Sequence, residues 1–99
     1  MPHRLAPRAE AGLDDIWVYV AKLSSSLEVA DRLIDDITRR FFALGCFPHI
    51  GRSREDDLGP GYRSLTVGDY VVIYRIEDDD VFILRVVHGR RDVAGIFGG

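Results

Sequence analysis

Apolar residues recur every three or four positions through two long stretches of the N-terminal half. The first stretch runs from residue 8 to about 22 and carries Leu13, Ile16, Trp17 and Val20. The second runs from about 26 to 44 and carries Ala30, Leu33, Ile34, Ile37, Phe41 and Leu44. This spacing predicts two amphipathic helices, each with one buried stripe. Because Trp17 falls on the first stripe, we expect it in the core.

Polar residues between and after these stretches mark the ends of the helices. The serines at 24–26 interrupt the first helix, and Ser25 with Glu28 forms a capping box that predicts the start of the second. Gly45 is the predicted C-cap, and Pro48 prevents the helix from continuing. Because the connection is short, the two helices are expected to pair as an antiparallel hairpin.

Strand signals stand at the N-terminus and fill the C-terminal half. Residues 2–6 predict a short first strand limited by Pro2 and Pro7, and residues 48–61 predict a long loop. Three further strands are predicted at residues 62–67, 70–76 and 81–88. Gly68 and Asp69 suit a type II′ turn between the first two of these. The middle strand is apolar on both faces, which predicts a central position in the sheet.

Together these elements predict an α+β fold in the order β-α-α-β-β-β. The antiparallel helical hairpin is expected to pack on one face of a small, mostly antiparallel sheet. A chain of 99 residues is expected to form one domain, so we assign residues 1–99 to a single domain.

The other face of the sheet is expected to lie open or to be covered by a partner, because two helices cover only one face. Strand alternation places Arg85 on the same face as Ile83 and Val87. An arginine among apolar residues is costly unless it is paired or solvated. Arg63 and Arg85 are therefore expected to point into the open face, or else to pair with acidic residues of the loops.

Composition narrows the class of protein. The chain is 46% hydrophobic and 29% charged, as soluble globular domains are, and its formal net charge is -3. Any contact with a polyanion therefore has to come from a local basic patch. No stretch approaches the roughly 20 apolar residues of a membrane span. The first residues also lack the apolar run of a secretory signal, so we expect a cytoplasmic protein without membrane contact.

The common catalytic and metal-binding sequence motifs are absent. Cys46, the only cysteine, lies three residues before His49, which leaves a nucleophilic pair as an alternative. A buried, inert thiol is the favoured interpretation, since Cys46 ends an apolar helix stripe. His3, His49 and His88 are scattered along the chain, so neither a metal site nor a cofactor is expected.

The main cationic cluster follows the last predicted strand, at His88, Arg90 and Arg91. Arginine side chains bind phosphates or carboxylates through two parallel hydrogen bonds. With a histidine as acid or base, such a cluster suits RNA cleavage. It equally suits docking to a protein, and the residues alone leave these two functions open.

Several short segments, taken in order, resemble a known family. They are Leu44 to Pro48, Gly51, Gly61-Tyr62-Arg63, Gly68-Asp69-Tyr70, Tyr74-Arg75 and the run Leu84-Arg85-Val86-Val87-His88-Gly89-Arg90-Arg91-Asp92. Across residues 3–92 the chain resembles the ParE/RelE superfamily of type II toxin–antitoxin toxins. The resemblance implies a toxin that is wrapped and neutralised by an antitoxin. It also implies that DNA is contacted only through the antitoxin, which binds the operator.

Within that superfamily, RelE-like members cleave mRNA on the ribosome, and ParE-like members inhibit DNA gyrase. RelE-type nucleases place a basic residue after the tyrosine that opens the central strand, where this chain has Val71 after Tyr70. They also use an aromatic acid or base near the tail, where this chain has Phe97. These departures favour a gyrase inhibitor that is not an enzyme and is held by a ParD-like antitoxin.

The alternative is a RelE-like, ribosome-dependent mRNA endonuclease. Its candidate catalytic residues are Arg85, His88, Arg90 and Arg91.

Two groups of residues are candidates for binding partners. The candidate target-binding residues are His88, Arg90 and Arg91, which concentrate positive charge on a net acidic protein. Trp17 and Phe42 are expected to offer apolar contacts to the antitoxin, and Arg63 is expected to pair with one of its acidic side chains. The antitoxin is expected to lie along the helical hairpin and across the open face of the sheet.

Overall fold

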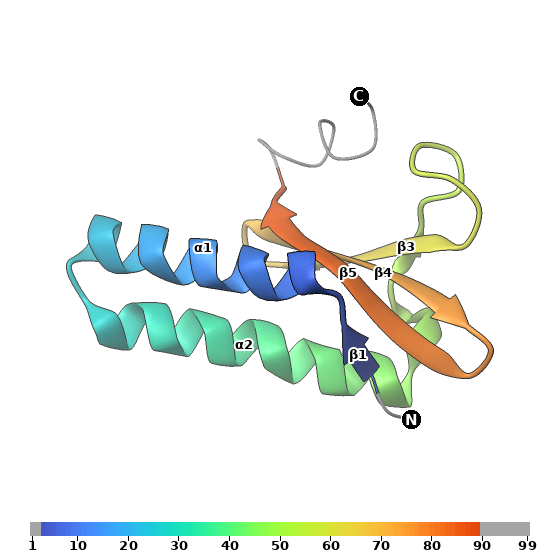
Figure 1. Cartoon of the computed structure of the whole chain (residues 1–99), viewed down its shortest axis with the longest axis horizontal. Coiled ribbons are helices and arrows are strands. Elements are labelled where there is room, and N and C mark those ends of the chain that lie inside the picture. The colour runs from blue at the N-terminus through green and yellow to red at the C-terminus, as the bar shows by residue number, and fades with distance from the viewer. Residues whose placement is uncertain (1–2, 90–99) are drawn as a thin grey trace.

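Two long helices lie side by side and cover one face of a twisted sheet (Figure 1). The computed structural model describes residues 3–89. Its elements are β1 (His3–Leu5), α1 (Pro7–Ser24), α2 (Leu27–Cys46), the 3-10 helix η1 (Pro48–Ile50), β2 (Arg52–Ser53), β3 (Tyr62–Val67), β4 (Tyr70–Glu77) and β5 (Asp80–His88). Within these residues the sheet has five strands in the order β1-β5-β4-β3-β2. β1 pairs with β5 in parallel, and the other pairs are antiparallel.

The α+β fold and the β-α-α-β-β-β order are therefore confirmed. β4 lies in the middle of the sheet, as its apolar sequence predicted. The predicted loop at 48–61 is wrong in part, since it contains η1 and β2. None of the described helices is long and apolar enough to cross a membrane.

The connection between the helices begins with a residue in the left-handed conformation. Ser25 ends α1 with φ 55°, and the chain then enters α2 through Ser26. The Ser26 hydroxyl accepts a hydrogen bond from the Val29 N–H at 3.2 Å. The predicted cap at Ser25 is thus wrong by one residue, because Ser26 is the residue with the extended backbone that a cap requires.

The C-terminal end of α2 also differs from the prediction. Gly45 is buried inside the helix and is not its cap, and the helix continues to Cys46. The Phe47 N–H donates a hydrogen bond to the Ala43 carbonyl at 2.8 Å, which completes the last helical turn. Cys46 is exposed, so the prediction of a buried thiol is wrong. Because α2 continues to Cys46, this residue lies two helical positions after the buried Leu44. Its side chain therefore points to a different side of the helix from the apolar stripe.

The main core lies between the helical hairpin and the sheet. Its buried residues are Ala9, Ile16, Ile37, Phe41, Leu44, Val67, Tyr70, Val72, Tyr74, Val81, Ile83 and Val86. Helix α1 approaches β5 closely at Gly12, where an added Cβ would lie 2.6 Å from the Val86 carbonyl oxygen.

Trp17 is half-buried and lies outside this core, so its predicted core position is wrong. Its indole N–H donates to Asp31 Oδ1 at 2.7 Å and links α1 to α2. Trp17 follows Ile16, which holds the buried position, and therefore stands at the edge of the stripe.

A β-bulge in β5 changes which side chains face the helices. Ile73 pairs with Arg85 and Tyr74 pairs with Ile83, so Leu84 is an extra residue in β5. Ile83 therefore faces the helices, whereas Arg85 faces the opposite side, and the prediction that they share a face is wrong. Val87 does lie on the side of Arg85, as predicted.

A smaller apolar cluster occupies this second face. It consists of Val71, Ile73 and Val87, with Leu58 and Tyr62 packed against them. The segment at 54–61 thus partly covers the face that the helices leave open.

Candidate functional site

The tip of β5 is tied to the turn between β3 and β4. The Gly89 N–H donates to the Asp69 carbonyl at 2.9 Å. The His88 ring stands edge-on to the Tyr70 ring, with 5.7 Å between their centroids. Arg90 and Arg91 lie outside the described residues. Of the three candidate target-binding residues, the structure therefore places His88 alone, and the role of the cluster stays a prediction.

Arg85 and His88 lie on opposite faces of the sheet. Arg85 pairs with Ile73 on the face away from the helices, and His88 pairs with Tyr70, which belongs to the core beneath the helices. A nuclease needs its acid–base group and its cation on the same phosphate. The structure does not bring this candidate pair together.

Arginines alternate with aromatic rings across the second face. The Arg4 guanidinium lies over the Phe82 ring at 5.9 Å, and that of Arg75 lies over the Tyr62 ring at 5.3 Å. Arg75 also approaches Glu77, with 3.5 Å between Nη2 and Oε1. These four residues form one cross-strand row over β1, β5, β4 and β3. Sequence reasoning missed Arg4, because its neighbours come from strands far away along the chain.

Arg54 anchors residues 54–61, which cover part of the second face of the sheet. Its Nε donates to both carboxylate oxygens of Asp57 at 3.0 Å, and its Nη1 donates to the Ser64 hydroxyl at 3.0 Å. The hydrogen bond from Arg54 holds the pKa of Asp57 below its usual value. The Leu58 N–H donates to the Arg54 carbonyl at 2.8 Å. Arg54 thereby fixes the loop that brings Leu58 onto the sheet.

The candidate antitoxin contacts lie in different surroundings. The Phe42 side chain is 69% exposed, and its ring stands edge-on to His3 with 5.1 Å between the centroids. Trp17 keeps part of its ring accessible beside Asp31. Arg63 faces the helix side of the sheet, so the prediction that it points into the open face is wrong. Its Nη2 donates to the His49 carbonyl at 3.1 Å.

Arg63 also donates to the Gly51 carbonyl, so its guanidinium already holds the segment between α2 and β2. The arginine therefore has a structural role that the sequence did not indicate. Its pairing with an antitoxin, like the roles of Trp17 and Phe42, stays a prediction.

Exposed apolar side chains gather at the two ends of the helical hairpin. The group near the α1–α2 connection consists of Val18, Tyr19, Leu23, Leu27 and Val29. The group near the end of α2 consists of Phe42, Phe47 and Ile50. Exposed apolar patches on a small domain indicate surfaces that bind another protein.

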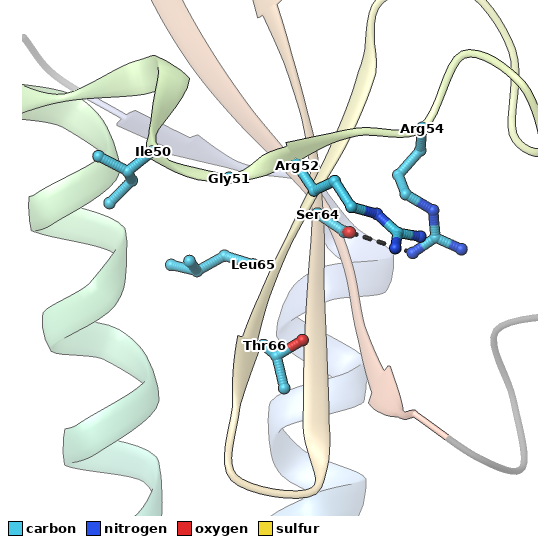
Figure 2. A pocket seen from close by; sticks show the side chains of 7 residues that line it. All are labelled: Ile50, Gly51, Arg52, Arg54, Ser64, Leu65 and Thr66. Atoms are coloured by element: carbon cyan, nitrogen blue, oxygen red, sulfur yellow. Dashed lines mark hydrogen bonds between the residues drawn. The ribbon is translucent and has the colours of Figure 1, made fainter.

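A cleft of about 420 Å³ opens between η1, β2 and β3 (Figure 2). Its lining consists of Ile50, Gly51, Arg52, Arg54, Ser64, Leu65 and Thr66. Figure 2 shows Leu65 pointing toward α2, whereas Ser64 and the two arginines lie on the other side of β3. The cleft is apolar on one side and cationic on the other. Sequence reasoning missed it, because β2 was assigned to a loop.

The wall of this cleft is fixed by a buried tyrosine. The Tyr74 hydroxyl donates to the Pro48 carbonyl at 2.7 Å and accepts from the Gly51 N–H at 3.0 Å. Because Tyr74 is fully buried on the central strand, it anchors η1 to the middle of the sheet.

Comparison with known proteins identifies the family. The model of the family described as "ParE toxin of type II toxin-antitoxin system, parDE" matches residues 4–93. The chain belongs to the ParE toxin family. Toxin ParE3 of Caulobacter vibrioides is 37% identical over 86 residues, which are 87% of this chain and 84% of that protein. The predicted resemblance to the ParE/RelE superfamily is thus confirmed.

Solved structures agree with this membership of the ParE family. The chromosomal ParDE system of P. aeruginosa contains a chain that is 26% identical, with a TM-score of 0.77 over 89% of this chain and 95% of that one. The toxin–antitoxin complex RelBE2 of Mycobacterium tuberculosis contains one that is 26% identical, with a TM-score of 0.67 over 87% and 94%. This ParE-family chain is a type II toxin–antitoxin toxin of the ParE/RelE superfamily.

Proposed function

We propose that this toxin inhibits DNA gyrase in the cytoplasm and that a ParD-like antitoxin neutralises it. The observation that carries the proposal is the match of the ParE toxin family to residues 4–93. The likeness to a chain of a ParDE system, at a TM-score of 0.77, supports the choice of antitoxin class.

The likeness to the RelBE2 complex keeps one alternative, an mRNA endonuclease acting on the ribosome. Two features of the chain argue against it. Arg85 and His88 face opposite sides of the sheet. Val71, which occupies the place of the nuclease's basic residue, is buried in the apolar cluster of the second face and offers no charge.

A target assay separates the two functions. The purified toxin is added to gyrase and relaxed plasmid, and supercoiling is followed on gels. We expect supercoiling to be inhibited and cleaved DNA to accumulate, with an SOS response in cells that express the toxin. Primer extension on cellular transcripts is run in parallel, and cuts in phase with codons would establish the endonuclease instead.

The contribution of the basic tip is tested with a double variant. Arg90→Ala with Arg91→Ala is expected to relieve growth arrest while the antitoxin still binds. The matched control is Arg39→Ala with Arg40→Ala, because these neighbouring arginines are exposed on α2 and their substitution removes the same amount of positive charge. The control is expected to remain toxic. Full toxicity of the tip variant would remove the tip from the target-binding surface.

Antitoxin contacts are tested by binding measurements on single variants. Trp17→Ala, Phe42→Ala and Arg63→Ala are each expected to weaken the complex with the antitoxin encoded beside the toxin. A variant that binds as tightly as the unchanged toxin takes its residue out of the interface.

A further inference from the structure

β2 and β3 bring four polar side chains onto one wall of the cleft. Arg52 pairs with Ser64 across the two strands, so their side chains share a face of the sheet. The pairing continues for one residue beyond β2, where the Arg54 N–H donates to the Tyr62 carbonyl at 2.8 Å. Because side chains alternate along a strand, Arg54 lies on the face of Arg52, and Thr66 lies on the face of Ser64. The four side chains therefore line the same wall (Figure 2).

This wall offers hydrogen-bond donors and positive charge. Its side chains are two guanidinium groups and two hydroxyl groups, all of which can donate. Among residues 3–89, no acidic side chain lines the cleft. Guanidinium groups bind oxyanions strongly, because their N–H groups match the spacing of two oxygens. The wall is therefore suited to an oxyanion.

The Ser64 hydroxyl is held so that it can donate into the cleft. Ser64 is buried, with 7% of its surface exposed, and its oxygen accepts a hydrogen bond from Arg54 Nη1 at 3.0 Å. A hydroxyl that accepts can still donate one hydrogen bond, and no residue within 3–89 accepts it. An oxygen atom of a ligand in the cleft would satisfy this buried donor.

Arg52 supplies the charge that is free to bind a ligand. The charge of Arg54 is compensated by Asp57, whose two carboxylate oxygens accept from Arg54 Nε at 3.0 Å. The hydrogen bond from Arg54 lowers the pKa of Asp57, and the charge of Arg52 contributes less to the same shift. Arg52 itself is exposed and has no side-chain hydrogen bond or ion pair among the described residues. One positive charge of this wall is thus uncompensated.

The opposite wall gives room for an apolar group. Leu65 pairs with Val72 of the main core and points to the helix side, and the Ile50 side chain there is 50% exposed. The cleft measures about 420 Å³. Pockets that bind small molecules measure about 300–1,000 Å³, so the space admits more than a bare ion.

The number of donors favours a phosphate monoester over other oxyanions. The available donors are the Arg52 guanidinium and the hydroxyls of Ser64 and Thr66. A monoester has three terminal oxygens and carries close to two negative charges at neutral pH. A carboxylate has two oxygens and one charge, and a phosphodiester in a nucleic-acid chain likewise has two free oxygens and one charge.

We propose that this cleft binds a small phosphate monoester. The phosphate lies against Arg52, Ser64 and Thr66, and the apolar part of the ligand lies between Ile50 and Leu65. The site goes beyond the proposed function, because neither gyrase nor an antitoxin takes part in it.

The direct test is a titration of the ¹⁵N-labelled toxin with phenyl phosphate, followed by NMR, with sodium chloride keeping the ionic strength constant. Saturable shifts are expected at the amides of Arg52, Ser64 and Thr66. Inorganic phosphate is expected to bind at least about threefold more weakly, because it has no ring to place between Ile50 and Leu65. A dinucleotide without a terminal phosphate is expected to bind more weakly as well, and phenol is expected to cause no shifts.

Single variants separate the two walls of the cleft. Arg52→Ala is expected to weaken the binding of phenyl phosphate about tenfold, since it removes a charged hydrogen bond. The matched control is Arg40→Ala, which removes an exposed arginine of α2 and is expected to bind normally. Ile50→Ser is expected to weaken the binding of phenyl phosphate and to leave that of inorganic phosphate unchanged. Circular dichroism checks that each variant is folded.

Each contrary outcome has a defined meaning. Unchanged affinity in Arg52→Ala, or shifts spread over the exposed arginines of the whole chain, overturns the site. Equal affinity for phenyl phosphate and inorganic phosphate reduces it to an adventitious ion and overturns the proposal. Equal affinity for the dinucleotide assigns the cleft to a nucleic-acid backbone and also overturns it. The assays with gyrase and with the antitoxin do not depend on any of these results, so the proposed function is tested separately.

Discussion

Tyr74→Phe isolates the anchor that shapes the cleft. The substitution removes one hydroxyl and keeps the aromatic ring, so the core around the fully buried side chain loses no packing. It breaks the bond to the Pro48 carbonyl and leaves the buried Gly51 N–H without its acceptor. The change therefore tests the two hydrogen bonds and not the volume of the core.

The expected magnitude follows from the burial of the two partners. The Gly51 N–H is buried, and losing its partner costs about 1–3 kcal/mol. The Pro48 carbonyl is only part-buried, so water can replace the hydroxyl and the loss is about 0.5–1.5 kcal/mol. We expect a fall of about 2–3 kcal/mol in the free energy of unfolding, after allowing for the lower cost of burying a ring without a hydroxyl. For a domain of this size, that lowers Tm by about 10–20 °C.

Urea unfolding followed by Trp17 fluorescence and by circular dichroism measures this change. The midpoint is expected to fall while the slope m stays constant, because the same surface is exposed on unfolding. Tyr19→Phe is the control, since its side chain is 46% exposed and water can replace a contact of its hydroxyl. A loss below about 0.5 kcal/mol for Tyr74→Phe would refute the reasoning, since it is no more than a surface substitution costs.

Three further predictions concern the helices and the N-terminal strand. Gly12→Ala places a Cβ 2.6 Å from the Val86 carbonyl oxygen, so α1 has to shift. Calorimetry is expected to show a loss of about 1–3 kcal/mol in the free energy of unfolding, and an unchanged Tm contradicts this contact. Burial lowers the pKa of His3 below 6.5, so the unfolded chain takes up the proton first and stability falls as pH drops below that value. Urea midpoints at about pH 7.5 and 5.5 are expected to differ more in the unchanged toxin than in His3→Gln, and equal differences refute this. Phe42→Ser is expected to leave stability within about 0.5 kcal/mol, since the ring is 69% exposed, yet to weaken antitoxin binding measured by calorimetric titration.

The pattern of apolar residues was sufficient to predict the layers of the fold. Helical spacing and alternating strands are local signals, and the Gly68 turn requires the positive φ of 59° that glycine adopts readily. The bulge at Leu84 left no such signal. The strand around it is apolar on both faces, so one extra residue does not disturb the pattern. The faces of Ile83 and Arg85 followed only from the pairing with β4.

The candidate site was less accessible to sequence reasoning. β2 is two residues long, too short to show a period, and its place is set by Arg63 and Tyr74 from other strands. The cleft beside Thr66 exists only because of that placement. The family motif led instead to Arg90 and Arg91, which follow β5 in the sequence and lie outside the described residues, so their roles remain predictions.

The pairing of β1 with β5 has a consequence for how the toxin is made. His3, from the first strand, lies beside Val81 in the last one, and α1 also packs on β5 at Val86. Contacts between chain ends form late in folding, because a long loop has to close first. A growing chain on the ribosome therefore cannot complete its core until β5 has emerged. Synthesis interrupted before that point is expected to leave fragments whose core is incomplete, because Val81, Ile83 and Val86 of β5 belong to it.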